Sequence, residues 1–466
     1  MSYLSSSSGA LILFGFGITM LVLSKLLAPR ASTTTSFLLA DRKLGWASGA
    51  MSIAASWLWA PALFISVQVA YEKGLAGLFW FTVPNVLALM MFSVLAPKIR
   101  EKMPEGFTLP QYILKRFGNK RLHQLYLFPY FFYQIMAVTV QLFAGGNLVA
   151  LLTGIPLDVA MPILLLIALS YTLVAGLKAS VLTDVLQLSM ILGAGTFILP
   201  MVWNRAGGWD QLSSGFSGIE GIEHFLDPQI AFSFGVVTSI GLIAGALSDQ
   251  QYWQRAFAIK KTDLKKAFLG GGLLFGLVPI ALSTLGFFAV NLDLTLPEGI
   301  DNSMIGVQTV ATLLPGGATL LFLIMLISGL SSTLDSGLSA ASSLWVTDVK
   351  PESGVSGARL SMVIVGVLGL GIAAAASKIN GFGLQHLWWV FNTIAACVMP
   401  PTLLSLYSDK ISAKGAYLGI LTSFIVGIPL FIYSNVLGDP NWIVGSALFV
   451  IFVSTGFSLS FKEPIE

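Results

Sequence analysis

Residues 328–337 read SGLSSTLDSG and interrupt a long apolar segment, between TLLFLIMLI (319–327) and LSAASSLWV (338–346). A helix that crosses a membrane needs about 20 predominantly apolar residues, and the combined stretch exceeds that length. The segment therefore predicts a transmembrane helix that carries hydroxyl groups and one carboxyl group at its centre. These groups must face protein or water, because lipid cannot satisfy them.

The composition of the whole chain is that of a polytopic membrane protein. Its 466 residues are 55% hydrophobic and only 10% charged, whereas soluble domains carry roughly 25% charged residues. The mean hydropathy is +0.83. We predict one all-α transmembrane domain over residues 1–466, and its single cysteine, Cys397, excludes an intrachain disulfide. Thirteen membrane helices are predicted near residues 9–28, 46–70, 76–96, 122–152, 157–176, 179–203, 229–253, 266–290, 316–346, 357–377, 383–406, 412–434 and 441–461.

The basic residues predict the orientation of the chain. If the N-terminus lies outside, 22 of the 25 Lys and Arg residues fall in loops on one side. Lys and Arg accumulate on the cytoplasmic side of membrane proteins, so we expect an external N-terminus and a cytoplasmic C-terminus in a bacterial inner membrane. Topology and anionic lipid account for these basic loops. No nucleic acid and no obligatory protein partner are expected.

Two predicted spans are interrupted at corresponding places. The second contains Pro61 within SWLWAPALF (56–64), and the seventh contains Gly241 and Gly245 within SIGLIAGALSD (239–249). Four intact spans separate them. Two broken spans, each opening a block of five helices, indicate an inverted-repeat secondary transporter with its site at the breaks. Pro and Gly also occur in ordinary membrane helices, so this pattern alone leaves both interpretations open.

Ionisable residues inside predicted spans are functional candidates, because burying them in a membrane is costly. They are Asp184, Asp249 and Asp335. Asp184 and Asp249 lie near predicted cytoplasmic ends, where an interfacial position is an alternative, whereas Asp335 lies deeper. Ser332 and Thr333 present consecutive neutral oxygens that suit a weakly held hard monovalent cation. We interpret the neighbouring serines as helix-packing residues: Ser331, Ser336, Ser339, Ser342 and Ser343.

Four stretches resemble signatures of the sodium:solute symporter family. They are FLLADRKLGWASGAMSIAAS (37–56), YTLVAGLKASVLTDVLQ (171–187), DQQYWQRAFAIK (249–260) and GLSSTLDSGLSAASSLWVTDV (329–349). The resemblance runs from about residue 37 to 350. It implies a leucine-transporter-like core of ten helices in a five-plus-five inverted repeat, over residues 46–406. One helix (9–28) would precede this core and two (412–461) would follow it.

The resemblance also implies a sodium site. In the family the ion is held by carbonyls of the first core helix and by one carbonyl and two hydroxyls of the eighth. By motif, these ligands fall on Ala55, Leu58, Gly329, Ser332 and Thr333. The expected activity is import of a small polar solute by alternating access, with Na⁺ as the coupling ion.

Two carboxylates are expected to assist the cation. Asp184 matches the family's aspartate on a cation path toward the cytoplasm. Asp335 carries no role by resemblance, and we consider it for a second ion, for a proton, or as a brace that accepts hydroxyl protons. A proton-coupled or facilitative carrier that uses Asp184 or Asp335 is therefore an open alternative, as is a transporter-like substrate sensor.

The substrate is predicted only as a class. The first core helix is most similar to urea active transporters, mainly through its two tryptophans, and the family's sugar-stacking tyrosine is not matched. A neutral, aromatic and amide-rich pocket suits urea, a small amide or an amino acid. Each candidate has an alternative role in packing or in an interhelical hydrogen bond. The candidates are Trp57, Trp59, Gln68, Asn85, Gln134, Gln141 and Asn392.

The sequence argues against a membrane enzyme. Its three histidines, His123, His224 and His386, lie on different predicted segments. Metalloprotease, nucleophile-elbow and phosphate-loop motifs are not found. Transport is therefore the favoured class of function.

Overall fold

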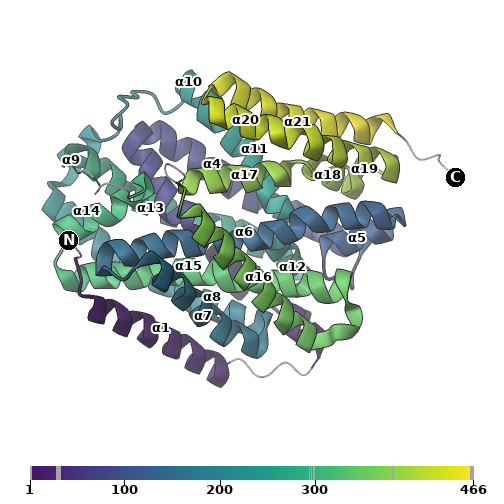
Figure 1. Cartoon of the computed structure of the whole chain (residues 1–466), viewed down its shortest axis with the longest axis horizontal. Coiled ribbons are helices and arrows are strands. Elements are labelled where there is room, and N and C mark those ends of the chain that lie inside the picture. Colours follow the sequence, from purple (N-terminus) through teal and green to yellow (C-terminus); the bar gives the residue numbers. More distant parts are fainter. Residues whose placement is uncertain are drawn as a thin grey trace.

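The computed structural model describes residues 3–27, 33–292, 294, 296, 300–379 and 383–461. The described chain is almost entirely helical, and its long helices lie side by side (Figure 1). The helices of the bundle are α1 (Ser6–Leu27), α3 (Trp46–Trp57), α4 (Ser66–Lys102), α6 (Lys120–Thr153), α7 (Leu157–Ala175), α8 (Leu177–Ala206), α11 (Val237–Ser248), α12 (Gln250–Ala258), α13 (Leu264–Asn291), α15 (Gly316–Leu344), α16 (Gly354–Ala376), α17 (Leu384–Ala396), α18 (Met399–Tyr407), α19 (Ala413–Thr422), α20 (Ile428–Leu437) and α21 (Pro440–Ser460). The predicted all-α class is confirmed.

Short helices connect these elements. They are α2 (Thr34–Leu39), α5 (Leu109–Phe117), α9 (Gly208–Ser214), α10 (Pro228–Ile230) and α14 (Ile305–Leu313). One isolated parallel β-bridge joins Leu44 to Ile259.

Twelve helices of the described chain are long and apolar enough to cross a membrane, one fewer than predicted. The difference arises in the run Pro61–Lys102, which counts as one helix of 42 residues. If straight, it would be about 60 Å long, roughly twice the apolar thickness of a bilayer. It folds back at Gly74, whose φ of 58° favours glycine, so that a Cβ added at Gly77 would lie 2.2 Å from the carbonyl oxygen of Val69. The run therefore contains two passes, which correspond to parts of the predicted spans 46–70 and 76–96.

The first predicted break is present. Helix α3 ends at Trp57, and the chain resumes as the π-helix η2 (Pro61–Ile65) before α4. Pro61 has no N–H to continue the helical hydrogen bonds, and the Leu58 N–H closes α3 by donating to Ala55 over 3.1 Å. The break therefore comprises residues 58 and 59, and Ala60 already has helical backbone angles.

The second break is present, but its predicted position is wrong. Gly241 and Gly245 lie inside α11, which ends at Ser248, and Asp249 in extended backbone separates it from α12. The two glycines instead allow close packing, since an added Cβ would lie 3.2 Å and 2.5 Å respectively from side-chain atoms of Asn392. The break is made by an aspartate that caps α12.

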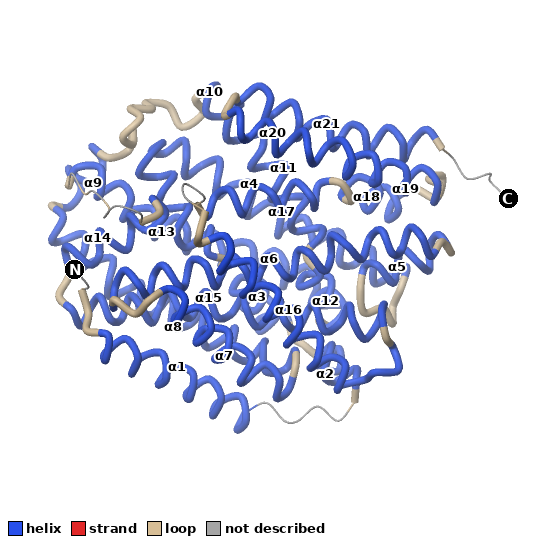
Figure 2. Tube along the Cα trace, in the orientation of Figure 1, coloured by secondary structure: helices blue, strands red, loops and turns tan. Residues whose placement is uncertain are grey.

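Helix α15 lies inside the bundle, packed against α3, α6, α8 and α12. All residues from 328 to 344, including the opening polar stretch, are buried. Helix α1 lies at one edge of the molecule and α19, α20 and α21 at the opposite edge (Figure 2). The proposed division into a core at 46–406 and flanking helices stays a prediction.

Candidate functional site

The predicted hydroxyl pair on α15 meets the break after α3. Thr333 Oγ1 donates to the Ser56 carbonyl over 3.5 Å, in the last turn of α3. At Gly329, an added Cβ would lie 2.8 Å from Leu63 of η2, so the missing side chain lets α15 approach the break. The residues predicted to bind sodium are all buried: Ala55, Leu58, Gly329, Ser332 and Thr333.

Ser332 links this region to a buried carboxylate on α8. Its hydroxyl donates to Asp184 Oδ1 over 2.5 Å, and the Ser52 hydroxyl donates to Asp184 Oδ2 over the same distance. Since Ser332 and Thr333 use their hydrogens on other acceptors, their oxygen lone pairs remain available to a cation. Neutral oxygens next to a carboxylate are a donor set that fits Na⁺.

Asp184 forms a buried ion pair with Arg255 of α12. The Arg255 Nη2 to Asp184 Oδ2 distance is 2.9 Å, and both side chains are fully buried. Arg255 also donates to Ser52 and Ser336 over 2.9 Å and 2.8 Å, and to the carbonyl of Gln251 over 3.1 Å. The guanidinium therefore connects α12 to α3, α8 and α15.

The sequence interpretation missed Arg255. It was assigned to a basic cytoplasmic loop, but it is 0% exposed. Asp184 and Asp249 are both fully buried inside the protein, and their depth relative to the membrane stays a prediction. Ser336, interpreted as a packing residue, accepts a hydrogen bond from Arg255. An arginine near a span end carries no local signal that distinguishes a loop charge from a buried partner.

Asp335 lies on the same helix but faces different partners. The Ser180 hydroxyl donates to its Oδ1 over 2.5 Å, and the Thr183 hydroxyl donates to its Oδ2 over 3.1 Å. Among the described residues, no basic side chain forms an ion pair with it. Asp335 is therefore a buried carboxyl group that is held by hydroxyls of α8.

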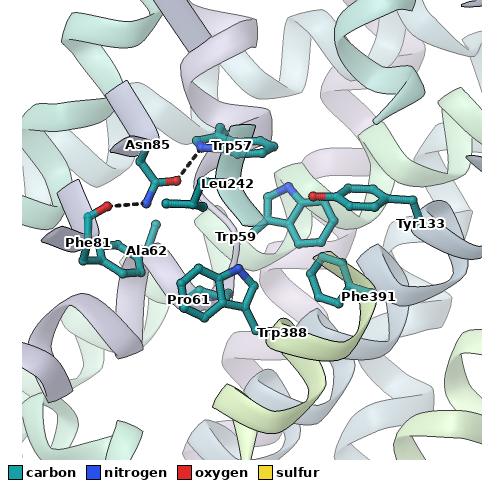
Figure 3. A pocket seen from close by; sticks show the side chains of 10 residues that line it. All are labelled: Trp57, Trp59, Pro61, Ala62, Phe81, Asn85, Tyr133, Leu242, Trp388 and Phe391. Carbon is teal, nitrogen blue, oxygen red and sulfur yellow. Dashed lines mark hydrogen bonds between the residues drawn. The ribbon is translucent and has the colours of Figure 1, made fainter. Parts of the chain in front are cut away.

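A small aromatic cavity lies beside the first break (Figure 3). Its volume is about 20 Å³, room for roughly one water molecule. Trp57 Nε1 donates to Asn85 Oδ1 over 2.8 Å, which fixes the only amide of the lining. Trp59 stacks on Phe391, with ring centroids 5.5 Å apart, and lies against Tyr133. The lining residues are Trp57, Trp59, Pro61, Ala62, Phe81, Asn85, Tyr133, Leu242, Trp388 and Phe391.

The model of the sodium:solute symporter family matches residues 37–423. The chain belongs to the sodium:solute symporter family. It is a membrane transporter and not an enzyme. Family membership confirms the predicted resemblance and extends it past residue 350.

Curated relatives of this symporter include urea and sugar carriers. The urea-proton symporter DUR3 of Oryza sativa subsp. japonica is 25% identical over 92% of this chain and 66% of its own length. Sodium/glucose cotransporter 1 of Mus musculus is 26% identical over 77% of this chain and 64% of its own length. The chain thus spans slightly less than two thirds of these two proteins.

Two solved structures share the fold of this symporter. The substrate-bound, outward-open state of a Na⁺-coupled sialic acid symporter has a TM-score of 0.78 at 17% identity, and the match covers 98% of this chain and 99% of that one. Mhp1, a nucleobase-cation-symport-1 family transporter in a closed conformation, has a TM-score of 0.56 at 15% identity, over 94% and 97% of the two chains. These matches confirm the leucine-transporter-like fold class.

Three predicted substrate residues of this symporter line the cavity: Trp57, Trp59 and Asn85. The three predicted glutamines are not part of the lining, and their side chains bond to other protein groups. Gln68 donates to Glu72 over 2.8 Å, Gln134 donates to Asp249 over 3.2 Å, and Gln141 accepts the Ala60 N–H over 2.9 Å. Gln134 and Gln141 thus bind protein groups at the two breaks, whereas Gln68 bonds to a residue one turn along its own helix.

Asn392 is also not part of this lining. Its Oδ1 accepts a hydrogen bond from the hydroxyl of Tyr133 over 3.3 Å, and it lines a second, smaller cavity with Gly241 and Trp388. Sequence reasoning did not select the aromatic lining residues Phe81, Tyr133, Trp388 and Phe391. Aromatic residues are frequent in apolar spans, so no local signal separates these four from ordinary packing residues.

Proposed function

We propose that this family member is a sodium-coupled symporter that imports a small neutral polar solute by alternating access. The observation that carries the proposal is the contact of α15 with the broken end of α3. There, Thr333 reaches the Ser56 carbonyl and Ser332 is bonded to Asp184. Such a junction of a helix break with hydroxyls is where this class of transporter holds its coupling ion.

Urea or a similar small amide is the proposed solute, with an amino acid as the second choice. The cavity has to widen to admit such a solute, so the support comes from the chemistry of its lining and not from its volume. Stacked rings at Trp59 suit a planar group, and Asn85 adds an amide that is already oriented by Trp57. The name of the rice relative, a urea-proton symporter, points to the same solute.

The test is uptake of radiolabelled urea by purified protein in proteoliposomes. Uptake should require an inward Na⁺ gradient. A Ser332→Ala/Thr333→Ala variant should raise the Na⁺ concentration for half-maximal uptake by at least about tenfold, or about 1.4 kcal/mol. Ser328→Ala is the matched control, because its hydroxyl donates to the Ile324 carbonyl in its own helix over 2.7 Å and contacts Met190 Sδ at 3.9 Å, away from Asp184 and the first break. An unchanged sodium requirement in the double variant would refute the assigned site.

A proton-coupled carrier is the second candidate. One observation favours it: Asp335 is buried among hydroxyl groups without a basic partner in the described chain. The rice relative is named a urea-proton symporter. This candidate requires urea uptake in sodium-free buffer after an inward pH step, and loss of that uptake in Asp335→Asn. Sodium-coupled uptake predicts no response to the same step.

The proposal includes a bacterial inner membrane, an external N-terminus and a cytoplasmic C-terminus. The distribution of basic residues supports the orientation of the two termini. Its test uses an impermeant thiol reagent on intact cells. The native Cys397 is buried, so a cysteine introduced at exposed Lys410 should be labelled only after the membrane is opened. Labelling in intact cells would reverse the orientation.

A further inference from the structure

The second helix break holds a carboxylate that the proposed sodium site does not use. Asp249 lies between α11 and α12 and is fully buried. Its Oδ1 accepts the backbone N–H of Gln251 over 2.9 Å and the side-chain amide of Gln134 over 3.2 Å. Its Oδ2 is buried as well and has no hydrogen-bond partner in the described chain.

Other unpaired oxygens lie on the same residues and their neighbours. Gln134 Oε1 on α6 has no partner in the described chain, and neither end of the Gln251 amide has one, nor has the hydroxyl of Tyr252. All of these side chains are buried. A buried polar atom without a partner costs about 1–3 kcal/mol, and several at one helix break indicate a ligand that contacts them.

The charge of Asp249 has no countercharge within hydrogen-bond reach in the described chain. The ionisable groups that face it are Tyr130 and Tyr133 of α6 with Tyr252 and Arg255 of α12. Arg255 carries the only positive charge of this group, and it is paired with Asp184. An isolated carboxylate in a membrane interior is strongly unfavourable.

Helix capping does not by itself require the charge. Asn caps a helix N-terminus about as well as Asp does, and the capping bond uses only Oδ1. The C-terminal end of α11 meets the same point, and the negative end of a helix favours a nearby cation. Carboxylate, amide and hydroxyl oxygens together are ligands for a hard cation.

We propose that Asp249, Gln134, Gln251 and Tyr252 bind a second Na⁺ ion, at a site separate from the one between α3 and α15. The inference rests on the proposed function, since it assigns a further coupling ion to the same transport cycle. The rings of Tyr252 and Tyr133 lie against Trp57 and Trp59, with centroids 5.0 Å and 5.3 Å apart. Both tryptophans line the cavity (Figure 3), so an ion that orders Tyr252 stabilises the wall of the solute pocket at Trp57.

The experiment is equilibrium binding of ²²Na⁺ to the purified full chain in detergent, without transport. Asp249→Asn should bind about one ion fewer than the wild type, because it loses the only charged ligand of the site while retaining the Oδ1 cap. Asp439→Asn is the matched control. Asp439 caps α21 in the same way, accepting the Asn441 N–H over 2.8 Å at a half-buried position. It should bind as much Na⁺ as the wild type.

A second variant tests the site if Asp249→Asn does not fold. Gln251→Leu removes the side-chain oxygen but keeps the backbone N–H that Asp249 caps, and it should weaken binding of one ion several-fold. Wild-type stoichiometry in folded Asp249→Asn overturns the inference. Proton exchange at Asp249 in place of sodium binding also overturns it. This outcome would appear as a pH-jump signal in sodium-free buffer that Asp249→Asn loses.

The binding assay tests the two proposed sodium sites independently of each other. Loss of one ion in Ser332→Ala/Thr333→Ala and of another in Asp249→Asn supports both assignments. Loss in Asp249→Asn with full binding in the double variant supports this inference and rejects the proposed α3–α15 site. The opposite pattern overturns the inference alone.

Discussion

Helix α6 contacts both helix breaks, but it forms a different interaction with each. At the first, Gln141 of α6 accepts the Ala60 N–H, so a neutral side chain satisfies the freed backbone. At the second, Gln134, two turns earlier on α6, donates to Asp249. The first break therefore has no charge of its own and faces the hydroxyls of α15, whereas the second break brings its own negative charge.

This comparison explains the position of Arg255. Arg255 lies about one and a half turns after the second break. Its guanidinium nevertheless neutralises Asp184 on α8, next to the first break. The two breaks are thus connected by one buried ion pair, and its charge is not available to Asp249. A substitution at either break is therefore expected to affect the other break through this ion pair.

The largest expected effect comes from removing that connection. Arg255→Met leaves Asp184 buried without its partner, and breaking a buried ion pair from one side costs about 3–5 kcal/mol. Thermal unfolding followed by tryptophan fluorescence should show the loss. The double variant Arg255→Met/Asp184→Asn should recover a large part of it. Equal stability of Arg255→Met and the wild type would contradict a connected pair of breaks.

The next largest effect tests the first break, where a neutral side chain accepts the freed backbone N–H. Gln141→Leu leaves the buried Ala60 N–H without an acceptor, which should lower the free energy of unfolding by about 1–3 kcal/mol. Gln141→Glu keeps an acceptor oxygen and should retain the bond. Hydrogen exchange at Ala60 reports it directly, with faster exchange expected only in the leucine variant. If exchange stays slow there, Gln141 does not hold the break.

A smaller effect is expected where the first break faces the cavity. Trp57→Phe keeps an aromatic ring but loses the N–H that donates to Asn85. The net loss of one hydrogen bond is about 1 kcal/mol, so KM for urea should rise about fivefold with an unchanged sodium requirement. Trp203→Phe, in a partly exposed position on α8, serves as the control. A shift in sodium dependence instead would place Trp57 at the ion site.

The smallest effect is expected outside both breaks. Asp41 forms an ion pair of 2.6 Å with Lys178 at the surface, and the Lys178 ammonium lowers the pKa of the Asp41 carboxyl. Because the folded-state pKa lies below the unfolded one, the pair stabilises the protein above the unfolded pKa, about 3.9. Its contribution disappears as the pH falls through the folded pKa.

Exposed pairs contribute less than about 1 kcal/mol. The melting temperature of Asp41→Asn should therefore stay within a few degrees of the wild type between pH 6 and pH 8. If Asp41→Asn lost as much stability as Arg255→Met, the expected difference between buried and exposed ion pairs in this chain would be contradicted.

Much of the fold was predictable from local patterns. The spans follow from runs of apolar residues, and the first break follows from Pro61, whose missing N–H acts within one helical turn. The second break was misplaced because glycine was taken as the breaking residue. The helix instead ends at Asp249, whose capping role depends on the N–H of Gln251 and on a contact from α6.

By itself, the sequence determined that the chain is a membrane transporter with two interrupted helices, a polar α15 and the motifs of its family. These properties depend on composition, on short-range periodicity and on motif order. Only the tertiary structure decided that Arg255 pairs with Asp184, that Gln134 and Gln141 serve different breaks, and that Asp249 is buried. These pairings join residues far apart in the chain, and lipid cannot satisfy buried polar groups, so the packing of the helices selects each partner.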